Sequence, residues 1–467
     1  MITVKQKAIF LDSDVATPIS LFLSRIGESE AGVLLESAEV GGRWGRYSLI
    51  CQGLLIKLTC RQGLLDVETA DFRFEPLTKF SGLPYLQGLK QLMRELTVLP
   101  DPAFESLPPI TRAFYGYLGY GLVSEIEPCL SPWINPKNSE AVMGLPAKVF
   151  LFDHAYNRLV EISLGGTALP LKVEPKESVG PEGLTVMPDK AAYLEIVRQG
   201  REEVARGELI QLVPSMGFEK PFSGSPFAVY RRLRRLNPSP YMFYLQLPEI
   251  SLICSSPEVL VSCDKNRLKL CPIAGTRPRG QDRVEDDLFE AELTADPKEI
   301  SEHVMLVDLG RNDLGRVAAS GSVKVERFME VERFSHVMHL TSHLGANLAE
   351  GKEAVDVIGA AFPAGTLSGA PKIKAMELIA RYEGIDRGPY GGAIGWLGLD
   401  KDKVNLDLGI AIRSLWVRDG RAYWRAGGGV VYDSEPQREW RECLNKAAAI
   451  VSALEGQSKE AGNVFNN

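Results

Sequence analysis

The sequence predicts an α+β fold built on large antiparallel β-sheets. Short strand-like runs follow one another and are punctuated by helices, without the regular strand–helix–strand rhythm of a parallel sheet. Turns separate the runs, as at Arg61-Gln62-Gly63. With 467 residues, 45% of them hydrophobic and 24% charged, the chain is long enough for two or three domains and a large core.

The first part of the chain is expected to consist mainly of strands. Residues 54–59 and 64–69 flank the turn at Arg61-Gln62-Gly63 and predict a hairpin. The other elements expected here are a helix at 86–96, an aromatic strand at 114–120 and an antiparallel pair at 149–151 and 158–164.

Residues 166–188 are rich in glycine and proline and poor in periodicity, so we expect a linker there. This linker separates an N-terminal portion, 1–165, from a second portion, 189–456. Residues 457–467 are polar and are expected to form a tail.

The second portion is expected to alternate between helices and strands. Asp189 predicts the start of a helix that runs to about Arg206 and stops at Gly207. Strands are expected at 209–213, 243–247, 252–254, 268–270, 323–328, 391–399, 406–415 and 421–427, the last three as a meander, and helices at 227–236, 298–313, 354–359, 371–382 and 437–454, with Pro371 in the first turn of its helix.

Charge and cysteine usage exclude several classes of protein. The net charge of −7 and a pI near 5.6 argue against nucleic acid as the main partner, because no basic field dominates. The 7 cysteines are scattered singly, which predicts neither a disulfide framework nor a zinc site. We find no signal peptide and no apolar run of membrane-spanning length, so we expect a cytoplasmic protein.

Two Glu-x-x-Glu pairs are candidates for chemistry. Glu299 and Glu302 lie one turn apart on one predicted helix, and Glu439 and Glu442 lie one turn apart on the last helix. A solvated charged face is the commoner reading of one such pair. Two facing helices, however, can supply carboxylates to one Mg²⁺, some directly and others through water.

Two glycine-rich segments and one arginine are candidates for binding an anion. Residues 363–372 feed a helix start with exposed N–H groups and Thr366, and 426–429 let backbone amides approach a ligand. The alternatives are a structural helix start and a bulge between strands. Arg413 interrupts an apolar strand and needs an anionic partner, either a substrate carboxylate or a structural acid.

These motifs together closely resemble the chorismate-utilising enzymes over about residues 190–455. The resemblance rests on the motifs Pro272-Ile-Ala-Gly-Thr-Arg-Pro-Arg-Gly280, Glu302-His-Val-Met-Leu-Val-Asp-Leu-Gly-Arg-Asn-Asp313, Ser335-His-Val-Met-His339, Gly365-Thr-Leu-Ser-Gly-Ala-Pro371, Gly388-Pro-Tyr-Gly391 and Pro436-Gln-Arg-Glu439. Within that family, the chain looks like the large, synthase subunits of the anthranilate synthases. The resemblance implies sheets packed as a sandwich with helices outside.

Three features distinguish this subfamily from its relatives. Ala274 stands where aminodeoxychorismate synthases typically have a nucleophilic lysine, and Gln211 stands where the resemblance aligns a water-activating lysine of the isochorismate- and salicylate-forming members. Leu34-Leu-Glu-Ser37 together with Asn237–Tyr244 resembles a split tryptophan feedback site. The implied inhibitor-binding residues are Glu36, Ser37, Asn237, Pro238, Ser239, Pro240, Tyr241 and Met242. The resemblance thus implies a regulatory, tryptophan-binding role for residues 1–165 and a chorismate-binding, catalytic role for residues 189–456.

The resemblance implies that chorismate and ammonia give anthranilate and pyruvate, the first committed step of tryptophan biosynthesis, with Mg²⁺ as the cofactor. By this resemblance, Glu302 and Glu442 bind Mg²⁺, and Glu299 and Glu439 act on it through water. Glu258 is the general acid for loss of the 4-hydroxyl, Gly275 marks the ammonia entry, and His339 assists loss of pyruvate. Tyr390 and Arg413 bind the enolpyruvyl carboxylate, and the ring carboxylate is fixed by Thr366, Gly427, Gly428 and Gly429.

The chain shows no Gly-x-Cys-x-Gly motif of a glutaminase, so we expect a separate glutamine amidotransferase subunit as the source of ammonia. Two alternatives remain open at this point. One is an aminodeoxychorismate synthase component, and the other is a non-catalytic tryptophan-binding regulatory protein on the same fold.

Overall fold

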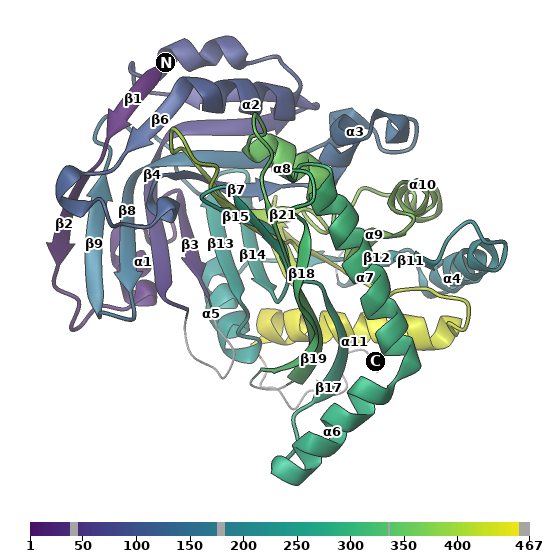
Figure 1. The fold of residues 1–467 in the computed structure, drawn as a ribbon. Coiled ribbons are helices and arrows are strands. Elements are labelled where there is room, and N and C mark those ends of the chain that lie inside the picture. Colours follow the sequence, from purple (N-terminus) through teal and green to yellow (C-terminus); the bar gives the residue numbers. More distant parts are fainter. Residues whose placement is uncertain (38–44, 175–182, 335–336, 457–467) are drawn as a thin grey trace.

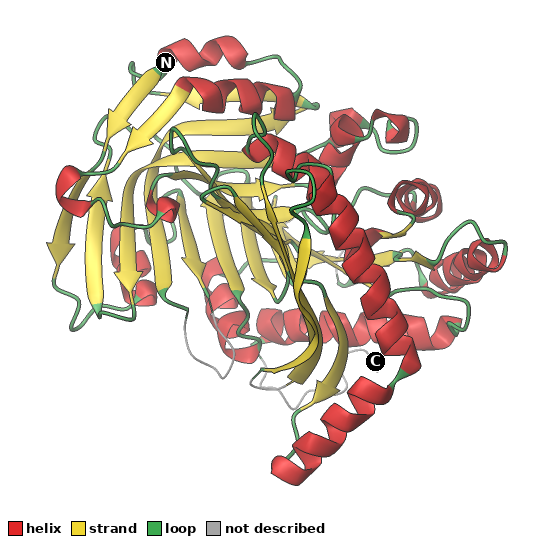
Figure 2. Cartoon of the chain, viewed as in Figure 1, coloured by secondary structure: helices red, strands yellow, loops and turns green. Residues whose placement is uncertain are grey.

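A computed structural model describes residues 1–37, 45–174, 183–334 and 337–456 (Figure 1). Within this part of the chain, 20 strands are joined by hydrogen-bonded ladders into one continuous sheet. Its ladders are antiparallel, whereas the separate pair β1 (Ile2–Lys5) and β6 (Leu96–Leu99) is parallel. Helices pack around the sheet (Figure 2). The predicted α+β class is confirmed.

Two long strands bend the sheet into two layers. β4 (Tyr47–Arg61) and β8 (Ala141–Asp153) pair along their length, with an irregularity between Leu54 and Ile56. On one side of it, the first layer continues through β3 (Gly32–Glu36), β13 (Tyr241–Leu247), β14 (Ile250–Ser256), β23 (Ser414–Arg418), β24 (Arg421–Gly427), β12 (Ser215–Pro221) and β10 (Thr185–Met187), and through β9 (Arg158–Ser163) and β2 (Lys7–Leu11).

On the other side, β4 and β8 belong to the second layer. Its strands are β5 (Leu64–Thr69), β7 (Ala113–Leu118), β21 (Ala393–Gly398), β22 (Leu406–Ile410), β15 (Val259–Asp264), β16 (Arg267–Leu270), β19 (Val337–Asn347), β17 (Ile273–Pro278) and β18 (Lys324–Arg333). β11 (Gln211–Leu212) pairs separately with β20 (Gly369–Ala370).

Strict alternation along the central strands produces the layered core. In β13, Phe243 and Leu245 face the second layer, where they share a core with Phe114 of β7, while Tyr244 belongs to a second core beneath helices. β14 alternates in the same way, with Ile253 on the helix side. Because side chains of a strand point to opposite faces in turn, a strand buried on both faces is apolar throughout.

The helices fall into two groups. Residues of α1 (Pro18–Arg25), α4 (Lys190–Ala205), α5 (Pro226–Leu236), α10 (Lys372–Glu383) and α11 (Pro436–Glu455) pack in the core outside the first layer. The remaining α-helices are α2 (Tyr85–Glu95), α3 (Val123–Ile126), α6 (Arg283–Ala295), α7 (Pro297–Gly315), α8 (Ala354–Ala361) and α9 (Gly365–Ser368). None of the described helices combines the length and apolar character needed to cross a membrane.

Two local predictions are wrong. Residues 406–415 do not form one strand, because the chain leaves β22 in the second layer and enters β23 in the first, turning at Arg413 with φ +48°. The predicted meander therefore consists of two hairpins in different layers. Pro371 is the N-cap of α10 and not part of its first turn, since its ψ of 139° is extended.

The predicted division at 166–188 does not separate two sheets. β3 pairs with β13 and β7 pairs with β21, so both portions contribute strands to both layers. Part of the predicted linker pairs as well, since β10 lies beside β12. The assignment of regulatory and catalytic roles to the two portions stays a prediction, and residues 457–467 lie outside the described part.

Candidate active site

A cavity of ≈ 560 Å³ brings together side chains from elements far apart in the sequence. α7 and α11 line it, as do β17, β19, β24, α9 and the connections around Glu258, Tyr390 and Arg413. The predicted site residues that line it are Glu258, Gly275, Glu299, Glu302, His339, Thr366, Tyr390, Arg413, Gly427, Gly429, Glu439 and Glu442. Gly428 lies beside it, since a β-carbon there would be 3.2 Å from Glu439 Oε2.

The four glutamates line the cavity as two pairs on two helices. α7 begins at Pro297 behind the N-cap Asp296, whose side chain accepts hydrogen bonds from the N–H groups of Lys298 and Glu299. This start fixes the turn that carries Glu299 and Glu302. Glu302 Oε1 accepts a hydrogen bond from Gln211 Nε2 at 3.2 Å.

Three positive side chains, those of Arg277, Lys298 and Lys446, lie near these four glutamates and offset only part of their mutual repulsion. Burial, followed by the neighbouring Glu302, raises the pKa of Glu299, although Arg277 lies 3.6 Å away. Burial also raises the pKa of Glu439, and Glu442 adds to the rise. Carboxylates that repel one another in a partly buried site are a donor set suited to a hard divalent cation. In the described residues, no three His, Cys, Asp or Glu groups already converge closely enough to hold one.

Glu258 lies on the connection between β14 and β15 and is 9% exposed. Burial raises the pKa of Glu258 to about 8, while the Thr366 hydroxyl and the Arg413 guanidinium oppose the rise. At neutral pH this carboxyl is therefore mostly protonated and able to donate a proton. The Thr366 hydroxyl lies near it but makes no hydrogen bond of normal geometry with any described residue, so it is available to a ligand.

His339 on β19 lies beside the bulge of β17. Its Nδ1 is 3.0 Å from Thr276 Oγ1 and 3.1 Å from the Gly275 carbonyl oxygen. Burial lowers the pKa of His339, which favours the neutral imidazole. Gly275 has φ +56°, and a β-carbon there would lie 2.6 Å from Leu293, so the position requires glycine. In the sequence motif Ser335-His-Val-Met-His339, residues 335 and 336 lie outside the described part.

Arg413 and Tyr390 lie on another part of the wall. Arg413 Nη1 donates to Asn237 Oδ1 at a long 3.5 Å, and no carboxylate within salt-bridge distance accompanies it among the described side chains. Burial lowers the pKa of Arg413, with Glu258 opposing. Tyr390 is 4% exposed, and its hydroxyl oxygen would lie 3.0 Å from a β-carbon at Gly427. A substrate carboxylate, not a structural acid, thus fits Arg413.

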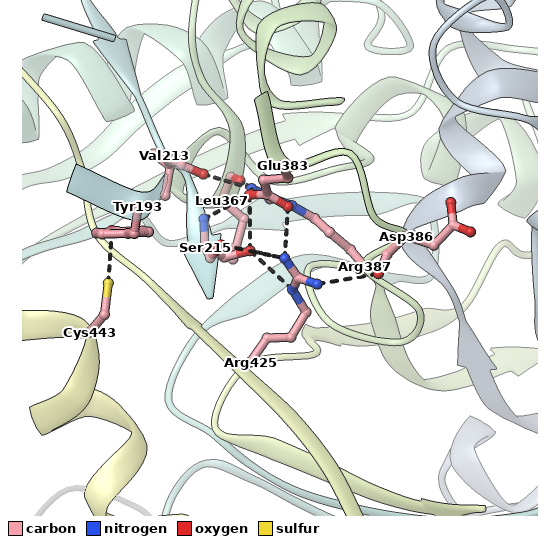
Figure 3. A network of polar contacts seen from close by, with 9 residues as sticks. All are labelled: Tyr193, Val213, Ser215, Leu367, Glu383, Asp386, Arg387, Arg425 and Cys443. Carbon is pink, nitrogen blue, oxygen red and sulfur yellow. Dashed lines mark hydrogen bonds and ion pairs between the residues drawn. The ribbon is translucent and has the colours of Figure 1, made fainter. Parts of the chain in front are cut away.

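Sequence reasoning missed a group of residues behind this wall. Arg425 lines the cavity and forms a buried network with Glu383 and Arg387 (Figure 3). The signal that singled out Arg413, a charge inside an apolar strand, also applies to Arg425 in Tyr423-Trp-Arg-Ala-Gly427. Lys446 lies one turn after Glu442 on α11 and also lines the cavity, and its Nζ lies 2.8 Å from Glu442 Oε1.

The two predicted inhibitor-binding segments lie on adjacent strands. Glu36 at the end of β3 is in register with Met242 of β13. The buried Glu36 carboxylate accepts a hydrogen bond from the Tyr230 hydroxyl at 2.7 Å and pairs with Arg234 at 2.7 Å. Ser37 accepts a hydrogen bond at its carbonyl from Gly45 N, and residues 38–44 between them lie outside the described part.

The other predicted residues of the second segment are interconnected. Ser239 Oγ donates to the Asn237 carbonyl oxygen, and the Tyr241 hydroxyl donates to Asp407 at 2.6 Å. Pro238 and Pro240 are part of the same turn, which leads from α5 into β13. The long-range strand pairing therefore joins stretches about two hundred residues apart.

Comparisons with known proteins identify the family and the fold of the chain. Residues 69–452 match the family described as chorismate binding enzyme. The chain is 38% identical to anthranilate synthase component 1 of Aquifex aeolicus, over 95% of this chain and 93% of that protein, and 38% identical to that of Thermus thermophilus, over 95% and 96%.

Among solved structures, the chain is similar to anthranilate synthase component I from Streptococcus pneumoniae, with a TM-score of 0.71 at 29% identity, covering 94% of this chain and 98% of that one. It also shares its fold with the menaquinone-specific isochorismate synthase from Escherichia coli, with a TM-score of 0.72 at 19% identity, covering 97% and 95%.

Proposed function

We propose, from the premise that the chain belongs to the chorismate binding enzyme family, that it is an anthranilate synthase component I. Ammonia adds to the ring of chorismate as the 4-hydroxyl leaves as water, and the ring then loses pyruvate to give anthranilate. The relatives of similar length that carry this name support the proposal.

The observation that carries the proposal is a cavity that contains the acid Glu258 and has alanine and glutamine, not lysine, at positions 274 and 211. Glu258 supplies a carboxyl with a pKa of about 8, which suits a general acid that protonates the departing 4-hydroxyl. Ala274 and Gln211 also line the cavity, and neither provides the lysine of the aminodeoxychorismate- or isochorismate-forming members. Because neither position carries that lysine, we propose that external ammonia is the nucleophile.

The glutamate pairs are proposed to bind Mg²⁺, with Glu302 and Glu442 as ligands and Glu299 and Glu439 acting through water. When bound, Mg²⁺ would neutralise the ring carboxylate and polarise the ring. Thr366 and the amides of residues 427–429 orient that carboxylate, which excludes other ring orientations.

The remaining groups act on the enolpyruvyl end of the substrate. Arg413 and Tyr390 bind its carboxylate, and the two donors of the guanidinium allow a bidentate contact. His339, held neutral beside Thr276, is placed to accept the ring proton as pyruvate departs. Both roles need groups that are desolvated, as these are.

Ammonia is proposed to come from a separate glutamine amidotransferase subunit. The name component 1 of the relatives refers to an enzyme with more than one component. The cytoplasm is the proposed location, since all seven cysteines, Cys51, Cys60, Cys129, Cys254, Cys263, Cys271 and Cys443, are unpaired.

The test is an assay of the purified chain with chorismate, Mg²⁺ and ammonium salt. We expect fluorescent anthranilate and an equal amount of pyruvate, with the product identified by mass spectrometry. Aminodeoxychorismate as the product, or no aromatic product, would contradict the proposal. Glutamine should replace ammonium only after the amidotransferase subunit is added.

Feedback inhibition by tryptophan is proposed for the segments Glu36–Ser37 and Asn237–Met242. Their pairing across β3 and β13 supports one shared pocket. Tryptophan should raise the apparent KM for chorismate, because it stabilises one arrangement of the chain over another. Ser37→Arg should abolish inhibition and retain activity, since the new side chain fills and charges the pocket. Unchanged kinetics at millimolar tryptophan would refute this proposal.

A further inference from the structure

Three charged side chains, those of Glu383, Arg387 and Arg425, form a buried network (Figure 3), and Arg425 lines the cavity. Glu383 Oε1 is 2.6 Å from Arg387 Nη2, and Glu383 Oε2 is 2.8 Å from Arg425 Nη2. The exposed fractions of these side chains are 1%, 2% and 4% for Glu383, Arg387 and Arg425. Burial raises the pKa of Glu383, but the two guanidiniums together lower it below its usual value. The three groups therefore carry one net positive charge.

The Arg387 guanidinium connects two segments that reach the cavity. Arg387 Nη1 donates to the Leu367 carbonyl oxygen at 2.7 Å, next to Thr366, and Nη2 donates to the Val213 carbonyl oxygen at 2.8 Å. Its Cζ lies 5.9 Å from the centre of the Tyr390 ring, within the range of a cation–π contact. Arg387 therefore contacts Tyr390 directly and fixes the backbone beside Thr366.

Arg425 holds the segment that carries the glycine cluster. Its Nη2 donates to Ser215 Oγ at 2.9 Å and its Nη1 donates to the Asp386 carbonyl oxygen at 3.3 Å. Ser215 is in register with Gly427 across β12 and β24. Ser215 N and Oγ also donate to Glu383 at 2.7 and 3.0 Å. Both terminal nitrogen atoms of Arg425 donate hydrogen bonds within the protein. Arg425 therefore acts on a ligand through its charge and by holding this wall of the cavity in place.

We propose that Glu383, Arg387 and Arg425 are positioning residues for the substrate's carboxylates, with their unbalanced positive charge drawing a dianion to this wall of the cavity. The inference rests on the proposed function, because chorismate carries two carboxylates. Two buried guanidiniums with one carboxylate are costly in isolation. A substrate carboxylate on the same wall supplies the missing negative charge.

The experiment measures the Kd of chorismate by calorimetry without ammonium, so that no turnover is needed. Arg425→Gln removes the net charge, and we expect the Kd to rise about tenfold, which corresponds to about 1.4 kcal/mol of binding free energy. Arg425→Gln combined with Glu383→Gln restores one net positive charge through Arg387, and the Kd should return to within about threefold of the original value.

Arg112→Gln is the matched control. Arg112 is also buried and paired, with Asp400 at 2.9 Å, but it does not line the cavity. We expect this variant to lower thermal stability and leave the Kd unchanged. If Arg425→Gln fails to fold, Glu383→Gln alone carries the test with the opposite sign, since two net charges should lower the Kd.

The outcomes separate this inference from the proposed function. An unchanged Kd in Arg425→Gln, or in Glu383→Gln where that variant is used, would overturn the charge proposal even if the original chain makes anthranilate. A Kd that stays high in the double variant would show that Arg425 acts by structure alone and would overturn it as well. Failure of the original chain to make anthranilate in the ammonium assay would instead refute the proposed function.

Discussion

The cavity has two chemically opposite walls. One carries two glutamate pairs on α7 and α11, where burial and mutual repulsion raise the pKa of Glu299 and of Glu439. The other carries Arg413 and, behind it, a buried network with one positive charge in excess. Each wall is electrostatically incomplete, and in opposite senses. A dianionic substrate together with a divalent cation balances both, whereas either one alone leaves one wall uncompensated.

The two walls of the cavity also differ in how far their side chains are exposed to solvent. The helix wall is partly open, since the Glu442 side chain is 45% exposed, so a cation can exchange with solvent there. On the arginine wall, the Arg387 and Arg425 side chains are buried, and two backbone carbonyl oxygens accept hydrogen bonds from Arg387. We conclude that the first wall is built for exchange and the second for orientation. Glu258, which lies near Arg413, is a neutral acid between them.

The largest expected effect is that of Glu258→Gln. Because the amide cannot donate a proton to the departing hydroxyl, kcat for ammonia-dependent anthranilate formation should fall about 10²–10⁴-fold. The Kd for chorismate should change little, since Gln keeps the shape of Glu. A variant with a nearly normal kcat would remove Glu258 from the acid role.

The next effect concerns the helix wall. Glu302→Gln and Glu442→Gln should weaken Mg²⁺ more than Glu299→Gln and Glu439→Gln, for which a loss of about 10–100-fold in affinity is typical of groups that act through water. The measurement is the Mg²⁺ dependence of the reaction rate. Equal losses at all four positions would mean that the division into direct and water-mediated ligands is wrong.

The pH dependence tests the group between the walls. Glu258 must be protonated to act, and its pKa is raised to about 8, so kcat/KM should fall about tenfold per pH unit above that value. The residual activity of Glu258→Gln should not show this fall in kcat/KM above pH 8. A fall that begins near pH 5 would show that the carboxyl titrates at its ordinary value.

The smallest effect is expected for Lys446→Met. Lys446 and Glu442 form an exposed pair, with side chains 52% and 45% exposed, and such pairs contribute little. We expect less than about a threefold change in rate and no change in stability beyond about 0.5 kcal/mol. A large loss would mean that Lys446, whose Nζ also donates to the Gly427 carbonyl oxygen at 3.0 Å, orients the glycine cluster.

Much of the fold was predictable because local signals agree with the final structure. The turn at Gln62-Gly63 does join a hairpin, since both residues have positive φ, and the Asp189 side chain does cap α4 by accepting from Ala192 N. The prediction of a single strand at 406–415 failed because an apolar pattern of this kind is the same in one strand as in two strands separated by a turn. Only the pairing partners of β22 and β23 distinguish the two cases.

The site was predictable in its residues but not in its arrangement. The sequence by itself determined the residue types and their local spacing: two Glu-x-x-Glu pairs, an acid in Ser-Pro-Glu258, and an arginine inside an apolar strand. Helical and strand periodicity follow from the backbone alone, so these features needed no tertiary contacts.

Only the tertiary structure decided which of these groups share one cavity and what their pKa values are. Packing of α7 against β17 and β19, and of α11 against β24, brings both helices to the cavity that Arg413 also lines, and burial raises the pKa of Glu258 there. Folding also brings Glu383, Arg387 and Arg425 together, and only this contact shows that two guanidiniums share one carboxylate. Desolvation and charge balance are properties of a folded neighbourhood, which no short stretch of sequence contains.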